Sequence, residues 1–337
     1  MIPESNQPSS PGLLPWLVGA VLRLTLVFTP APTVYLIRRV FQKTGAVTAA
    51  NLEQGAPGDV DVRRDLRYGD DAAERYDLYL PAGKKPPGLV FWIHGGAFVG
   101  GAKEELSGYL KRIAHAGHAV VAPEYTLAPK GRHPTQLGQL MACLDQVLSP
   151  TYQQIESLVL AGDSAGAMLA TQLALTLIDG DYASLTGVNP SARAGERLVG
   201  TILCCGPFGL TEFGRTSELG RQFGDAVLWA YSGKRRFSED RGFVDAMSVI
   251  GRVGSSFPAT IITVGNADPL AAQSEALADR LEASGVSVER HFYPVDREPA
   301  LGHEYQFDLG TEEAKEFLTA TISWLRARSV PEAGPQA

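Results

Sequence analysis

Hydrophobic positions along the chain predict strands that alternate with helices. Four apolar runs have the length of strands and are typical of strands buried in a parallel sheet. They cover residues 89–93, 158–161, 260–264 and 286–293. The longer apolar stretch at residues 165–175 indicates a helix directly after the second run. Alternation of this kind over 337 residues predicts one α/β domain with insertions.

The loop after the second run carries a serine in a tight strand-to-helix turn. Residues 162–166 read Gly-Asp-Ser-Ala-Gly, the only G-x-S-x-G pattern in the chain. Such a turn strains the backbone at Ser164 and requires neighbours without side chains, which Gly162 and Gly166 supply. The helix that follows points its positive end at the same place, where it favours a developing oxyanion. We therefore predict that Ser164 is the nucleophile of an acyl transfer.

The loop after the first run is rich in glycine. Residues 94–98 read His-Gly-Gly-Ala-Phe. The N–H groups of Gly95 and Gly96 can approach a substrate oxygen closely because no side chain stands in the way. The amide of Ala165, which follows the serine, is the third predicted oxyanion donor. His94 is expected to be structural, not catalytic.

Two loops in the C-terminal half contain a candidate acid and a candidate base. Their order along the chain is serine, acid, histidine, as in enzymes whose serine lies in a strand-to-helix G-x-S-x-G turn. His303 follows the run 286–293 and is the predicted base. Asp268 follows the run 260–264 and is the predicted acid. Asp296 precedes His303 in the same loop and is the alternative acid. We prefer Asp268 because the end of a strand holds a carboxylate more firmly than a long loop does.

These motifs, together with residues 266–270 and 302–303, resemble the hormone-sensitive-lipase-type branch of the α/β-hydrolases. The resemblance spans residues from about 60 to 325. It implies an α/β-hydrolase fold: a mostly parallel sheet of eight strands flanked by helices, with a helical cap. It also implies hydrolysis of carboxylic esters with neither a metal nor an organic cofactor. The segment 124–129 resembles a further family motif, although Thr126 stands where an arginine is usual.

Composition and charge narrow the class of protein. The formal net charge is −7, and because nucleic-acid binding depends mainly on clustered Lys and Arg, nucleic acid is not an expected partner. The three cysteines, Cys143, Cys204 and Cys205, show no metal-ligand spacing and are too few for a disulfide framework. We expect packed thiols. The expected partner is a small ester substrate, and a homodimer is compatible with the sequence.

Residues 1–50 are expected to form an apolar helical segment. The strongly apolar stretch 13–28 is shorter than the roughly twenty apolar residues that a membrane span needs. Two interpretations remain open. The segment either forms part of the cap that walls the acyl pocket, or it lies on a membrane with Arg38, Arg39 and Lys43 facing the lipid head groups. The expected location is accordingly the cytoplasm or a membrane surface.

The rest of the chain is expected to form a catalytic domain, residues 51–330, and a disordered tail, residues 331–337. A second cap element is predicted as an insertion at about residues 207–250, which are rich in Phe, Trp, Tyr and Gly. Its aromatic side chains either contact the substrate or form the core of the cap. The candidates for substrate contact are Phe208, Phe213, Phe223, Trp229 and Tyr231.

The predicted function is that of a serine carboxylesterase, which hydrolyses short- to medium-chain esters through an acyl-enzyme. An alternative on the same fold is an amidase or deacetylase that acts on small acetylated compounds. An alternative from a different class is a non-catalytic ligand-binding protein that keeps the fold. Such a receptor would be expected to lose the serine or the histidine, so the presence of both favours an enzyme.

Overall fold

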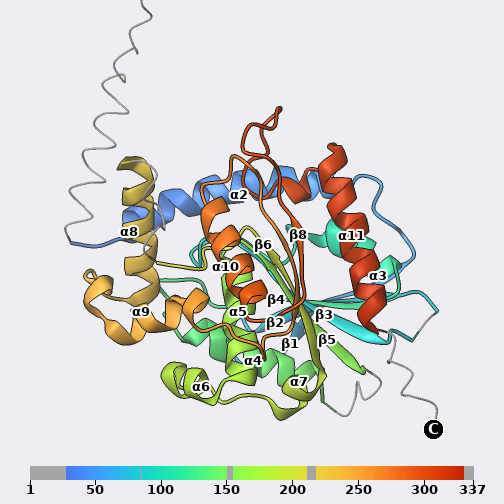
Figure 1. Cartoon of the computed structure of the whole chain (residues 1–337), viewed down its shortest axis with the longest axis horizontal. Coiled ribbons are helices and arrows are strands. Elements are labelled where there is room, and N and C mark those ends of the chain that lie inside the picture. The colour runs from blue at the N-terminus through green and yellow to red at the C-terminus, as the bar shows by residue number, and fades with distance from the viewer. Residues whose placement is uncertain (1–27, 84, 150–154, 211–217, 330–337) are drawn as a thin grey trace, which may run out of the picture.

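The computed structural model describes residues 28–83, 85–149, 155–210 and 218–329, which fold around one sheet with helices on both faces (Figure 1). The strands are β1 (Val60–Arg67), β2 (Arg75–Pro81), β3 (Gly88–Ile93), β4 (Ala119–Pro123), β5 (Ser157–Asp163), β6 (Leu198–Cys204), β7 (Ala259–Thr263) and β8 (Val288–His291). They pair in the order β1-β2-β4-β3-β5-β6-β7-β8. The pairs β1·β2 and β2·β4 are antiparallel and the others are parallel. The predicted eight-stranded, mostly parallel sheet is confirmed.

The buried strands have side chains in two hydrophobic cores, one on each face of the sheet. Along β3, Leu89 and Phe91 belong to one core, whereas Val90 and Trp92 belong to the other. Both faces need apolar side chains, which is why these strands appear in the sequence as continuous apolar runs. The run at residues 286–293 forms a shorter strand than predicted, because its pairing with the short strand β7 covers four residues.

Helices from different parts of the chain cover the two faces. The helices are α2 (Ala31–Glu53), α3 (Ser107–His115), α4 (Thr135–Val147), α5 (Ala165–Ile178), α6 (Gly180–Thr186), α7 (Ala192–Arg197), α8 (Glu218–Ser232), α9 (Arg241–Met247), α10 (Ala271–Ala283) and α11 (Glu312–Ser329). Short 3₁₀ turns are η2 (Phe237–Glu239), η3 (Val249–Gly251) and η4 (Tyr305–Phe307). Buried residues of α3 and α11 share one core, and those of α4, α5 and α10 share the other.

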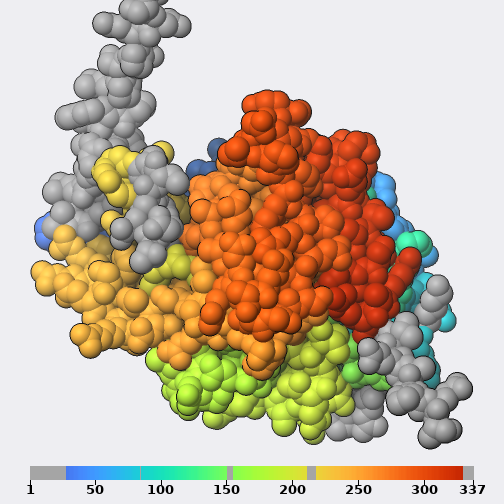
Figure 2. Space-filling model, viewed as in Figure 1, coloured from blue at the N-terminus to red at the C-terminus, as the bar shows by residue number. Residues whose placement is uncertain are grey.

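The C-terminal third of the chain, orange to red in Figure 2, occupies the centre of the molecular face that carries α10 and α11. The yellow-green helices α6 and α7 lie along its lower edge, and the yellow-orange region of α8 and α9 lies beside it. Segments far apart in the sequence therefore share this surface. The loops after β7 and β8, which carry the predicted acid and base, belong to this C-terminal third.

Helix α2 packs against α3 and α8 (Figure 1). Arg38 points inward and donates hydrogen bonds to the carbonyl oxygens of Val99 and Ala128. The proposal that Arg38 faces lipid is therefore wrong, because its guanidinium is used to anchor the helix. The side chains of Arg39 and Lys43 are exposed. Within the described ranges, no helix is both long and apolar enough to cross a membrane.

Parts of three predicted elements lie outside the described residues. These are residues 1–27 of the N-terminal segment, residues 211–217 of the insertion, which include Phe213, and the tail at 331–337. All three cysteines are described, and each is a free, buried thiol, as the sequence predicted.

Candidate active site

Ser164 lies in the turn between β5 and α5 with a backbone conformation that is rare for a residue other than glycine. Its φ is 49° and its ψ is −120°. The turn depends on two glycines that approach other backbone atoms. A Cβ added to Gly162 would lie 2.4 Å from Gly166 C, and one added to Gly166 would lie 2.0 Å from Ile93 O. The G-x-S-x-G pattern predicts this geometry because side chains at either position would clash.

The structure brings Ser164, His303 and Asp268 into one hydrogen-bonded chain. The Nε2 atom of His303 lies 3.0 Å from Ser164 Oγ, and its Nδ1 atom lies 2.7 Å from Asp268 Oδ2. The other carboxylate oxygen of Asp268 accepts a hydrogen bond of 2.8 Å from the N–H of Leu270, and the carboxylate is fully buried. Asp296 is exposed in the loop after β8, and no contact within the described residues joins it to His303.

The Cys205 thiol lies against this histidine. Cys205 Sγ, a carboxylate oxygen of Asp268 and a ring nitrogen of His303 lie within 4.8 Å of one another. Burial lowers the pKa of His303, but contact with Cys205 and the hydrogen bond to Asp268 raise the pKa, and the balance is upward. In the described part of the chain, these three side chains form the one cluster whose atoms lie close enough together to bind a metal ion. Because Asp268 and His303 already bind each other, their arrangement suits proton transfer.

The loop after β3 presents a different set of amides from the predicted one. The N–H of Gly95 donates a hydrogen bond of 2.8 Å to Asp163 Oδ2. The prediction that Gly95 is an oxyanion donor is therefore wrong, because its hydrogen is already used. The N–H groups of Gly96 and Ala165 donate to no acceptor among the residues described, and both residues line the cavity at Ser164. These two remain the candidate donors.

Asp163 is a residue of the site to which the sequence analysis assigned no role. It is 3% exposed, and its Oδ1 accepts a hydrogen bond of 2.9 Å from the indole N–H of Trp92. Its Oδ2 holds Gly95, as described above. Burial and the charge of Glu304 raise the pKa of Asp163 to about 7, against the effect of the hydrogen bonds. The only signal in the sequence was its place inside the serine motif.

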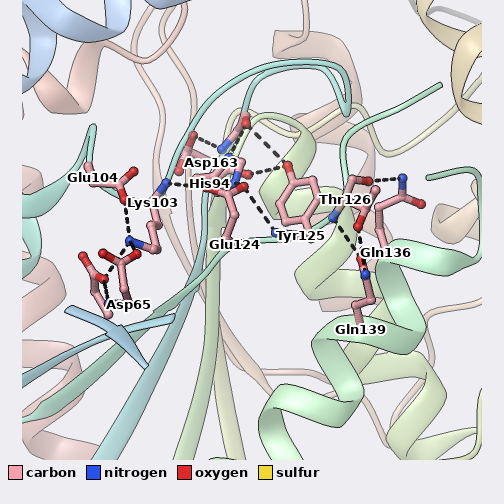
Figure 3. A network of polar contacts seen from close by, with 12 residues as sticks. Asp65, His94, Lys103, Glu104, Glu124, Tyr125, Thr126, Gln136, Gln139 and Asp163 are labelled. Atoms are coloured by element: carbon pink, nitrogen blue, oxygen red, sulfur yellow. Dashed lines mark hydrogen bonds and ion pairs between the residues drawn. The ribbon is translucent and has the colours of Figure 1, made fainter. Parts of the chain in front are cut away.

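A network of polar side chains supports the glycine-rich loop at residues 94–98 (Figure 3). His94 is buried, with its Nδ1 2.7 Å from Gly95 O and its Nε2 2.9 Å from Glu124 Oε1. Its ring stacks on Tyr125 at a centroid distance of 4.4 Å. Burial alone would lower the pKa of His94, but Glu124 raises it to about 9, so both ring nitrogens can donate. The imidazole thus holds the loop in place, in agreement with its predicted structural role.

Thr126, which replaces the usual arginine, is held by two glutamines of α4 (Figure 3). Its N–H donates to Gln139 Oε1 at 2.9 Å, and Gln139 Nε2 donates to the threonine hydroxyl at 2.9 Å. Gln136 Nε2 donates to the carbonyl oxygen of Thr126 at 2.8 Å. Neutral amide hydrogen bonds therefore fix the backbone and the hydroxyl group at this position.

A cavity of about 690 Å³ is lined by Ser164 and His303. One side of its lining belongs to loops at the ends of strands, and the other belongs to helices α2 and α8. The apolar side chains in the lining include Phe41, Pro207, Phe223, Pro269 and Leu270. The polar side chains include Thr44, Thr48, Asn51, Glu105 and Glu304.

Three predicted substrate contacts do not line this cavity. Phe208 and Tyr231 are fully buried in the core, and the Tyr231 ring stacks on Phe98 at 4.0 Å. Trp229 is partly exposed and lies under the guanidinium of Arg235. The alternative interpretation, in which these aromatic residues pack the insertion, fits their positions. Of the other candidates, Phe223 does line the cavity.

Comparison with known proteins agrees with this architecture. A family model described as alpha/beta hydrolase fold matches residues 90–297, more than half of the chain. The acetyl esterase of Salmonella choleraesuis (strain SC-B67) is 26% identical over 295 residues, a match that covers 84% of this chain and 81% of the esterase. The kynurenine formamidase of Danio rerio is 37% identical over 114 residues. That match covers 33% of this chain and spans only 38% of the formamidase.

The fold also resembles solved structures. Esterase B from Lactobacillus Rhamnosis (HN001) aligns with a TM-score of 0.76 and 22% sequence identity. The alignment covers 89% of this chain and 96% of that chain. At this level of identity, the similarity establishes a shared fold.

Proposed function

This chain belongs to the α/β-hydrolase family, in its hormone-sensitive-lipase-type branch, and on that premise we propose that it is a serine carboxylesterase. Its substrates are short- to medium-chain carboxylic esters, and the reaction passes through an acyl-enzyme. The observation that carries the proposal is the hydrogen-bonded chain Asp268–His303–Ser164, whose serine end opens into the cavity. The similarity to an acetyl esterase over most of the chain supports it.

The distances support a role for each of the three side chains. A carboxylate only accepts hydrogen bonds, so Asp268 accepts one from Nδ1–H of His303, and this tautomer leaves Nε2 free to accept a proton. Nε2 takes the proton of Ser164 across 3.0 Å as the serine oxygen attacks the ester carbonyl. The histidine then returns this proton to the departing alcohol. A water molecule, activated by the same histidine, hydrolyses the acyl-enzyme.

The negative charge that develops on the carbonyl oxygen requires donors, and we assign them to the amides of Gly96 and Ala165. Ala165 is the first residue of α5, where the positive end of the helix adds to the stabilisation. Gly95 serves the same purpose indirectly, because its bond to Asp163 fixes the loop next to Gly96.

We propose that α2 and α8 form the cap that walls the acyl pocket. Phe41 of α2 and Phe223 of α8 lie with their ring centroids 6.4 Å apart, and both line the cavity. The cavity volume falls in the range of small-molecule sites and suits an acyl group of modest length.

Hydrolysis of p-nitrophenyl esters from acetate to laurate tests the proposal directly. We expect turnover that falls for the longest chains, and Ser164→Ala should lower kcat by about 10⁶-fold while the protein remains folded. Equal rates for the variant and the intact protein, or no hydrolysis of any ester, would contradict the proposal.

Amide hydrolysis is the second candidate, favoured by the partial match to a kynurenine formamidase. The same three side chains could serve it if the histidine protonates a departing amine. Rates on a p-nitroanilide and on the p-nitrophenyl ester of the same acid separate the two activities. A higher kcat/KM on the anilide would favour the amidase.

A further inference from the structure

Glu105 places a carboxylate without a protein partner in the wall of the cavity that holds Ser164. It follows the glycine-rich loop and precedes α3. Its carboxylate forms no hydrogen bond or ion pair with any residue that the structure describes, and only longer-range charges act on it. Its neighbour Glu104, by contrast, is outside the cavity lining and pairs with Lys103. The two adjacent acids therefore have different surroundings.

The position of Glu105 is set by the close approach of α2. A Cβ added to Gly45 would lie 2.4 Å from the Glu105 carboxyl group, so the backbone of the helix passes directly beside this carboxyl group. Burial raises the pKa of Glu105, His94 lowers it, and the negative charges of Asp163 and Glu124 raise it, with a net pKa of about 7. A half-buried carboxylate in this position lacks the partner that would offset its desolvation.

The rest of the cavity lining also favours a cation. Glu304 lines the cavity with its carboxylate 3.9 Å from His303 Nε2, and Asp308 adds another acid. Among the described residues that line the cavity, none is a lysine or an arginine. The acidic side chains in the lining outnumber its two histidines, so the lining favours a cationic ligand over an anionic one.

Two aromatic rings complete this environment. Phe41 and Phe223 meet edge to face in the wall formed by α2 and α8, the same wall that carries Gly45. The face of an aromatic ring attracts a cation, and together with a carboxylate it can hold an ammonium group that carries methyl substituents. Apolar contact and charge are thus available in one cavity.

From these observations we infer that the preferred substrates are esters that carry a positively charged amine or ammonium group, which Glu105 binds. The inference rests on the proposed function, because it assumes that the ester occupies this cavity. It assigns Glu105 to substrate selection and not to the chemical steps.

A pair of esters with the same shape tests the charge alone. Butyrylcholine and 3,3-dimethylbutyl butyrate differ by one atom, a quaternary nitrogen in place of a carbon. We expect kcat/KM to be about tenfold higher for the cationic ester, because the interaction free energy of one partly screened charge pair corresponds to a ratio of about this size. Glu105→Gln should reduce this ratio to near one, while the control Glu104→Gln should keep it. Equal kcat/KM for the two esters with the unaltered protein would overturn the inference without any variant.

Binding separates this inference from the proposed function. Calorimetric titration of Ser164→Ala with each ester measures affinity in the absence of turnover. Tighter binding of butyrylcholine, lost when Glu105→Gln is added, supports the role of Glu105 in binding the cation even if no ester is hydrolysed by the intact protein. Equal affinity for the two esters overturns it, even if p-nitrophenyl esters are hydrolysed and the esterase proposal stands.

Discussion

The two sides of the cavity are built in different ways. On one side, Ser164, Gly96 and His303 belong to loops that follow strands of the sheet, and hydrogen bonds join this side to the core. On the other side, Phe41 and Phe223 come from helices that lie against each other, and both rings are partly exposed. The first side holds the proposed reacting groups, and the second is the proposed wall of the acyl pocket.

This difference teaches that chemistry and selectivity depend on different kinds of contact. A reacting group must be held to within a fraction of an ångström, so its supports are directional hydrogen bonds. A pocket wall needs only shape and polarity, which helix packing supplies. Substitutions on the strand side should therefore lower kcat, and those on the helix side should change the choice of substrate.

The largest expected effect comes from the acid. Asp268→Asn should lower kcat by about 10⁴-fold with a small change in melting temperature, because an amide favours the wrong tautomer of His303. Asp296→Asn is the matched control and should leave kcat unchanged, since that side chain is exposed. Steady-state kinetics on a p-nitrophenyl ester measures both. A large loss in the control alone would make Asp296 the acid.

An intermediate effect is expected at Asp163. Asp163→Asn keeps the shape of the side chain, but its amide N–H group must face either the indole N–H of Trp92 or the backbone N–H of Gly95. Because two donors repel each other, we expect the loop beside Gly96 to shift. A displacement of this order should lower kcat by about 100-fold with little change in KM. Trp92→Phe removes the other hydrogen bond and should lower the melting temperature more than it lowers kcat. Equal losses of kcat in the two variants would mean that Asp163 acts only through core stability.

The smallest effect is expected on the helix side. Phe41→Ala and Phe223→Ala enlarge the pocket and should move the preferred ester by a few carbons, with changes in kcat/KM of about threefold to tenfold. Tyr231→Phe is the control, because that hydroxyl is buried without a hydrogen-bond partner in the described chain and lies away from the cavity. The p-nitrophenyl series measures the profile. An altered profile for Tyr231→Phe alone would reverse the assignment of the wall.

The parts of the molecule that the sequence predicts are those encoded by neighbouring residues. Strands β3, β5 and β7 are apolar because both of their faces are buried, and the turn at Ser164 needs its two glycines for steric reasons. The loops after β7 and β8 could be assigned because parallel strands deliver their ends to one edge. Asp268 was distinguished from Asp296 by this argument, and the structure joins Asp268 to the histidine.

The parts that could not be predicted depend on residues far apart in the chain. Gly95 was assigned as a donor because it has no side chain to block a substrate oxygen, but its N–H is bonded to Asp163, which lies 68 positions away. The N-terminal segment was one of two proposed parts of the cap, but individual substrate contacts were sought only in the insertion. Phe223 of the insertion lines the cavity and Tyr231 does not, whereas Phe41 of α2 lines it and was not named. Which face of a helix meets a cavity depends on how it docks, and composition alone carries no such information.

Arg38 limits how this enzyme can be redesigned. Its guanidinium ties α2 to the carbonyl oxygen of Val99, and the N–H of Val99 in turn bonds to Gly96 O. The helix that sets the size of the pocket is thus tethered to the loop that carries a proposed oxyanion donor. Moving α2 outward to admit a bulkier acid would pull on that donor, so larger substrates and fast turnover compete. Side chains on the helix can be trimmed to widen the pocket, whereas its axis must stay where it is.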